Sequence, residues 1–167
     1  MSVTEEIVSA NRQYAASFDK GDLAMPPKRQ VAVVVCMDAR IDPARALGLE
    51  EGDAHVIRNA GGRTGDALRS LVISQQLLGT KEVVVIHHTD CGMLKFTNDA
   101  LRSQCVETFG ENASEAADSI DFLPFGDLEQ SVRDDLTLIR ESPLIPDSIP
   151  VRGFVYDVST GLLAEVA

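Results

Sequence analysis

The sequence predicts an α/β fold: a mostly parallel central β-sheet flanked by helices, with an antiparallel edge hairpin at the C-terminus. Apolar, β-branched segments at 31–36, 55–58 and 82–87 alternate with segments of helical periodicity. This alternation is typical of parallel strands joined by right-handed crossovers. At the C-terminal end, 151–158 is separated from 162–166 by a turn sequence, which predicts the hairpin.

The first element is expected to be a helix over residues 3–19, with Thr4 as its cap. Apolar side chains recur along it at helical spacing, namely Ile7, Ala10, Tyr14 and Phe18. Gly21 and the pair Pro26-Pro27 end this helix. Residues 1–25 are therefore predicted to form an N-terminal helical arm.

The first strand is expected at 31–36, and a short helix follows it. Asp42 can cap that helix, Pro43 suits its first position, and Gly48 marks its end. The second strand, 55–58, leads into a glycine-containing turn at 59–62.

A longer helix is expected to begin at Thr64 or Asp66 and to end near Leu78, before the third strand at 82–87. The acidic stretch 98–121 has a weaker pattern, with one helical segment and a surface excursion from Asn112 to Asp121. A further helix is expected over about 126–140.

Length and charge narrow the possible classes of protein. A chain of 167 residues suits one domain, 1–167. The net charge of −11 argues against a nucleic-acid partner or an anionic membrane surface. No apolar run approaches the roughly 20 residues of a membrane span, and no signal peptide is visible. A cytoplasmic location is expected.

Metal-binding side chains follow two of the predicted strands. Cys36 ends the first strand, and His88 and Cys91 follow the third. Neighbouring parallel strands bring such residues to one edge of the sheet. Two thiolates and one imidazole suit zinc, which accepts mixed sulfur and nitrogen ligands in a tetrahedron. No fourth cysteine or histidine is evident, so one position of the predicted zinc site is left over.

Asp38 and a water molecule are the candidates for that fourth position. Asp38 lies two residues beyond Cys36, and Arg40 lies two residues further. The arginine is expected to grip both carboxylate oxygens. It would thereby pull Asp38 off the metal and leave the position open for water.

This pattern resembles the β-class carbonic anhydrases, whose hallmark is Cys-x-Asp-x-Arg followed by His-x-x-Cys. The segments 58–61 and 153–161 also resemble that family. The resemblance implies one Zn²⁺ per subunit held by Cys36, His88 and Cys91, with Asp38 and Arg40 as the catalytic dyad. It also implies a homodimer or a dimer of dimers, with the sites near the interface. Ala39 stands where many members have serine.

The implied reaction is the reversible hydration of carbon dioxide to bicarbonate and a proton by a hydroxide activated on zinc. Hydrolysis of carbonyl sulfide or carbon disulfide on the same scaffold is an alternative. A protein in which zinc only braces the fold and a partner binds elsewhere is another. The expected activity rises through alkaline pH, because two thiolates already neutralise the zinc dication.

Two further residues, His87 and Asp90, lie beside the predicted ligands. His87 should face the opposite side of its strand from His88, as a packing or supporting residue. Asp90 is solvated or hydrogen-bonds its loop, and no catalytic role is predicted for it.

Overall fold

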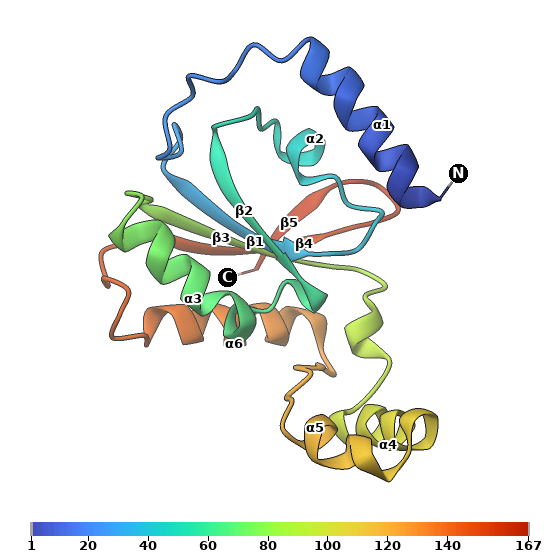
Figure 1. The fold of residues 1–167 in the computed structure, drawn as a ribbon. Helices are drawn as coiled ribbons and strands as arrows, with labels where there is room; N and C mark the ends of the chain where they lie inside the picture. The colour runs from blue at the N-terminus through green and yellow to red at the C-terminus, as the bar shows by residue number, and fades with distance from the viewer. Residues whose placement is uncertain (1, 167) are drawn as a thin grey trace.

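The computed structural model describes residues 2–166 and contains a five-stranded sheet in the order β2-β1-β3-β4-β5 (Figure 1). The strands are β1 (Val31–Cys36), β2 (Ala54–Asn59), β3 (Glu82–His88), β4 (Val151–Tyr156) and β5 (Leu163–Val166). The first four are parallel, and β5 pairs antiparallel with β4. The predicted α/β sheet with its C-terminal hairpin is confirmed.

The described residues also contain six α-helices. They are α1 (Val3–Ala16), α2 (Pro43–Leu47), α3 (Thr64–Gln76), α4 (Asn98–Phe109), α5 (Ser114–Asp118) and α6 (Leu128–Arg140). Short 3-10 turns occur at Ala60–Gly62, Gly92–Leu94 and Glu111–Ala113. None of the described helices is both long enough and apolar enough to cross a bilayer.

Helices α3 and α6 cover one face of the sheet, and α2 lies on the other (Figure 1). The strand parity explains this arrangement, since Ala32 and Val34 point toward α3 and α6 whereas Val33 and Val35 point the other way. Apolar positions of α6 recur at helical spacing and are buried, namely Val132, Leu136 and Ile139. Two apolar clusters therefore sandwich the sheet.

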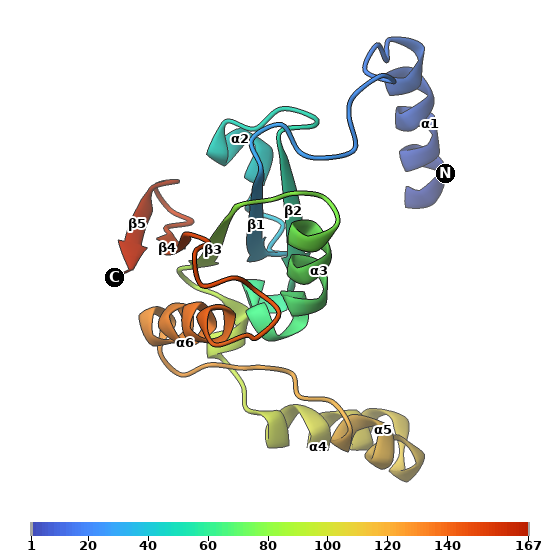
Figure 2. The same cartoon turned by 90° about the vertical axis from the view of Figure 1, so that its left-hand side faces the viewer.

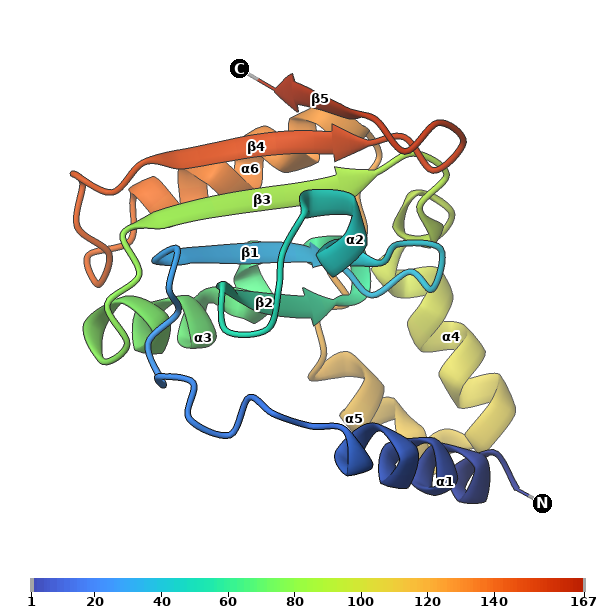
Figure 3. The same cartoon turned by 90° about the horizontal axis from the view of Figure 1, so that it is seen from above.

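Two helical parts stand away from the sheet. The pair α4 and α5 projects beyond the end of the strands, and α1 lies apart from every other helix (Figure 2). Viewed from above, an extended segment joins α1 to β1 (Figure 3). All described residues of α1 are exposed.

Several predicted boundaries were wrong. Ser2, not Thr4, caps α1: its side chain accepts from the Glu5 amide, and the Glu5 carboxylate accepts from the Ser2 amide. With Ser2 as the cap, the first helical residue is Val3, two residues earlier than a Thr4 cap would allow. The helix ends at Ala16 rather than 19, and the surface excursion after 112 contains the short helix α5.

Candidate metal centre

The sheet topology brings the predicted ligands together at one edge. Strands β1 and β3 are parallel neighbours, with Val35 opposite Ile86, so Cys36 and His88 both lie at the carboxyl edge. Connections leave β1 toward β2 on one side and leave β3 toward β4 on the other. Such a reversal in strand order opens a crevice where α/β proteins place ligands.

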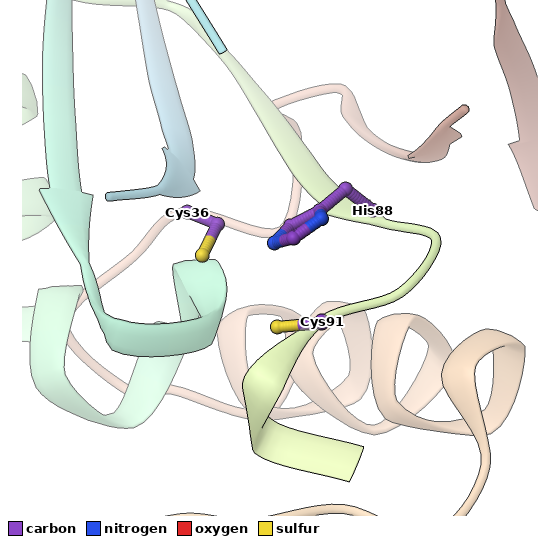
Figure 4. Close-up of side chains that lie close together, drawn as sticks. All are labelled: Cys36, His88 and Cys91. Atoms are coloured by element: carbon purple, nitrogen blue, oxygen red, sulfur yellow. The ribbon is translucent and has the colours of Figure 1, made fainter. Parts of the chain in front are cut away.

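Three side chains converge in this crevice. The ligand atoms of Cys36, His88 and Cys91 all lie within 4.8 Å of one another. Figure 4 shows the two sulfur atoms and the imidazole pointing toward a shared space. All three residues are buried, and His88 is 0% exposed. They form the only such cluster of three metal-binding groups among residues 2–166.

The hydrogen bonding of His88 fits a metal ligand. Its Nδ1 lies 2.8 Å from the Thr89 carbonyl oxygen, which can only accept, so Nδ1 carries the proton. The Nε2 atom is buried and has no hydrogen-bond partner. A buried imidazole lone pair without a partner is costly, and a metal ion would satisfy it. The residues present therefore fit zinc.

The two thiols are electrostatically coupled. A hydrogen bond from Cys91 lowers the pKa of Cys36 to about 4, although burial opposes the shift. The same contact and burial raise the pKa of Cys91. One thiolate is thus easily formed, while the second proton is held between the two sulfurs. A divalent cation can replace that proton, because metal ligation requires both sulfurs to be deprotonated.

Asp38 and Arg40 form the predicted pair beside these ligands. Arg40 donates from Nε to Oδ1 of Asp38 at 3.0 Å and from Nη2 to Oδ2 at 2.8 Å. The backbone amide of Arg40 also donates to Oδ1. Together these hydrogen bonds hold the pKa of the Asp38 carboxyl well below its usual range. Oδ2 lies 3.7 Å from His88 Nε2, yet Asp38 is not part of the three-residue cluster.

Asp90 has a contact that the sequence interpretation missed. Its carboxylate accepts from Nη1 of Arg40 at 3.0 Å, and its carbonyl accepts from Nη2 at 3.1 Å. No local pattern reveals this contact, because Asp90 lies 50 residues from Arg40 in the sequence. The only hint of this contact in the sequence is that Asp90 lies between two predicted ligands, which the sheet should bring close to the loop that carries Arg40.

The loop after β1 is fixed from the second strand. Arg58 donates to the carbonyl oxygens of Cys36 and Asp38, with distances of 2.8–3.2 Å. Gly62, at φ +69°, lies so close that a Cβ there would come within 2.8 Å of the Cys36 nitrogen. The turn after β2 therefore packs directly on the ligand loop.

A small pocket opens onto the cluster. Its volume is about 210 Å³, and besides the three predicted ligands it is lined by Met37, Asp38, Ala60, Gly61, Gly92 and Met93. Drug-sized ligands occupy pockets of roughly 300–1,000 Å³, so this one suits a much smaller molecule. Its wall combines apolar methionine side chains with the Asp38 carboxylate.

Behind the site, a buried polar cluster surrounds His87 on the opposite face of β3. The two ring nitrogens of His87 lie 2.7 Å from Ser131 Oγ and 3.1 Å from Asp135 Oδ2. Asp135 also accepts from Arg63 and from the Thr64 amide. His87 thus faces away from the metal cluster and supports the strand end, as predicted.

A buried Cys-His-Cys group beside a small pocket, at the carboxyl edge of a parallel sheet, is the arrangement of an α/β protein that could hold a metal ion there. The carbonic anhydrase family model matches residues 31–163. The chain therefore belongs to the carbonic anhydrase family, and the relatives below place it in the β class.

Beta-carbonic anhydrase 1 of Mycobacterium tuberculosis is 46% identical over 167 residues, covering 99% of both chains. The solved carbonic anhydrase from Glaciozyma antarctica is 50% identical, with a TM-score of 0.95 and full coverage of both chains. The carbon disulfide hydrolase of Saccharolobus solfataricus is 33% identical over 190 residues, covering 96% of this chain and 87% of that protein.

Proposed function

We propose that this protein is a zinc-dependent enzyme that reversibly hydrates carbon dioxide to bicarbonate and a proton. The buried cluster of Cys36, His88 and Cys91, next to a carboxylate held by Arg40, is the observation that carries this proposal. The match to the β-class carbonic anhydrases supports it. Zinc would supply a Lewis acid that activates water as a nucleophile.

The protein's own residues have distinct parts in this reaction. Cys36, His88 and Cys91 would hold one zinc ion per subunit. Asp38 would accept a hydrogen bond from the attacking oxygen and orient its lone pair, and Arg40 keeps the Asp38 carboxylate in place. The small pocket excludes bulky substrates. Asp38 remains a candidate fourth ligand in a closed form of the site.

Stopped-flow measurement of carbon dioxide hydration from about pH 6 to 9, with metal analysis of the same preparation, tests this function. We expect one zinc per chain and a rate that rises with pH. The reason is that two thiolates neutralise the cation, so the governing pKa lies above the value of about 7 known for three-histidine sites. A flat profile, or a preparation without stoichiometric metal, would contradict the proposal.

Hydrolysis of carbon disulfide or carbonyl sulfide is the second candidate function. The similarity to the carbon disulfide hydrolase of Saccharolobus solfataricus favours it. Both molecules are linear like carbon dioxide and would enter a similar pocket. Parallel assays with all three substrates separate the candidates. Rapid sulfide release with negligible hydration of carbon dioxide would favour the second candidate. No turnover of any substrate, with zinc bound, would favour a metal that only braces the fold.

We further propose that the chain acts as a single zinc-binding domain, 1–167, whose residues 1–25 form an arm for self-association. The ends of that range, residues 1 and 167, lie outside the described part of the structure. Exposed apolar side chains on α1 support a homodimer or a dimer of dimers. We also propose that the protein works in a reducing compartment such as the cytoplasm, because both thiols must stay reduced to bind metal.

A further inference from the structure

Arg40 is shared between two carboxylates on different loops. One edge of its guanidinium faces Asp38, on the loop after β1, through Nε and Nη2. The remaining Nη1 donates to Asp90, on the loop after β3, and Nη2 also reaches the Asp90 carbonyl. Arg40 therefore connects the loop that carries Cys36 to the loop that carries His88 and Cys91.

Asp90 is itself held in an unusual conformation. Its φ is +53°, a left-handed value that few residues other than glycine, asparagine and aspartate adopt. Lys95 donates to its second carboxylate oxygen at 2.7 Å, so each Asp90 oxygen has a separate cationic partner. Residues kept in sparsely populated backbone conformations cluster at functional sites. Both the backbone and Lys95 thus aim the Asp90 carboxylate at Arg40.

We propose that Asp90, braced by Lys95, is a positioning residue that anchors Arg40 and so keeps Asp38 off the metal position. This inference rests on the proposed function, because it assigns a role within the same site. Asp90 would act only through Arg40 and Asp38, without touching the substrate.

The geometry explains why an anchor is needed. Asp38 Oδ2 lies only 3.7 Å from His88 Nε2, so a small rotation would carry the carboxylate toward the ligand cluster. Arg40 can oppose that rotation only if its own guanidinium is held in place. The Arg40 side chain is 46% exposed. The hydrogen bonds to Asp90 tie it to the opposite loop. Without them, the Arg40 guanidinium would lose its tie to the loop after β3 and would hold the Asp38 carboxylate less firmly.

Azide binding to the cobalt-substituted full-length protein measures access to the fourth metal position. Visible absorption at one fixed pH gives the azide affinity without relying on turnover. We expect Asp90→Asn to weaken azide binding about fivefold, the upper end for an exposed ion pair. Asparagine removes the charge while tolerating the left-handed backbone. Lys95→Met should weaken azide binding in the same direction by a smaller factor.

Glu165→Gln is the matched control, because it neutralises an exposed carboxylate that pairs with Arg152 on the β4–β5 hairpin. This variant should leave azide affinity unchanged. Asp90→Asn in an Asp38→Ala background is the decisive comparison. If Asp90 acts through Asp38, the second substitution has no further effect on azide affinity there.

Three results would overturn the inference. They are unchanged or tighter azide binding in Asp90→Asn, the same fivefold loss in the Asp38→Ala background, and no cobalt binding by the unsubstituted protein. If Asp90→Asn fails to fold, azide binding by Lys95→Met, measured in the wild-type and Asp38→Ala backgrounds, tests the proposal instead. Absence of carbon dioxide hydration alongside the expected azide pattern would refute the proposed activity but support the anchor.

Discussion

At the residue scale, the site depends on how a few side chains are oriented by partners that do not bind the metal. The Thr89 carbonyl selects the His88 tautomer whose Nε2 faces the cluster. Arg40 likewise fixes Asp38, with two hydrogen bonds from its guanidinium and one from its backbone amide. Removing such supporting partners usually costs roughly 10–100-fold in metal affinity or activity.

Arg40→Met should accordingly lower kcat/KM for carbon dioxide hydration by about 10–100-fold. Methionine keeps a similar length but cannot grip the Asp38 carboxylate. Stopped-flow assays at constant zinc content measure the effect. Arg152→Met, which removes an exposed arginine remote from the site, is the control and should retain the wild-type rate. Equal rates in the two variants would refute this role for Arg40.

At the scale of elements, the turn after β2 is built to approach the ligand loop. Gly62 has φ +69°, and a Cβ there would meet both the Cys36 nitrogen at 2.8 Å and the Ile86 carbonyl oxygen at 2.9 Å. Both contacts are backbone atoms of the strands that carry the predicted ligands. A side chain at this position must therefore move β1, β3 or the turn.

Gly62→Ala should destabilise the protein by more than about 1 kcal/mol and also weaken zinc binding, because Cys36 is displaced. Gly79→Ala is a matched control: φ is +73°, but nothing lies within 4 Å of its added Cβ. Gly79→Ala should therefore lose stability through backbone strain alone and keep the wild-type zinc affinity. Urea unfolding and competition with a zinc chelator measure the two quantities. Equal zinc affinity in both variants would contradict this account.

Helix α6 is tied to β3 and to the turn by one buried carboxylate. Asp135 is 1% exposed and accepts from Arg63, His87 and the Thr64 amide. Burial alone would raise its pKa, but these hydrogen bonds outweigh burial and lower it. A depressed folded-state pKa means that the stabilisation is present above the unfolded value of about 3.9 and is lost as the pH falls below it.

Asp135→Ala should therefore cost about 3–5 kcal/mol of unfolding free energy near neutral pH, because it leaves Arg63 without its buried partner. The difference from wild type should shrink only below about pH 4. Asp134→Ala removes an exposed carboxylate from the same helix and should change stability little. Urea unfolding at pH 7 and at low pH compares them. A similar loss in both variants would show that α6 does not depend on this carboxylate.

At the scale of the whole molecule, α1 is the feature least explained by a single chain. Its described residues are all exposed, including Val3 at 71% and Ile7 at 63%. Tyr14 and Lys20 of the arm both contact Glu51. An amphipathic helix with an uncovered apolar side is typical of an element that packs on another subunit.

Ile7→Glu should accordingly shift the protein toward a smaller assembly, because it places a charge on that apolar side. Analytical ultracentrifugation at several concentrations measures the change. Ser9→Glu adds the same charge about 200° further round the helix and is the control. It should leave the assembly intact. A wild-type protein that sediments as a monomer at all concentrations would rule out the self-association proposal.

The sequence by itself determined the sheet, the convergence of Cys36, His88 and Cys91, and the Asp38–Arg40 pair. These features follow from short-range periodicity and from strand ends meeting at one edge of a parallel sheet. Only the tertiary structure decided that Arg40 also binds Asp90, that Asp135 receives His87 and Arg63, and that Gly62 presses on Cys36. Those contacts join residues 26–72 positions apart, and their distances depend on loop conformation, which leaves no repeating pattern in the sequence.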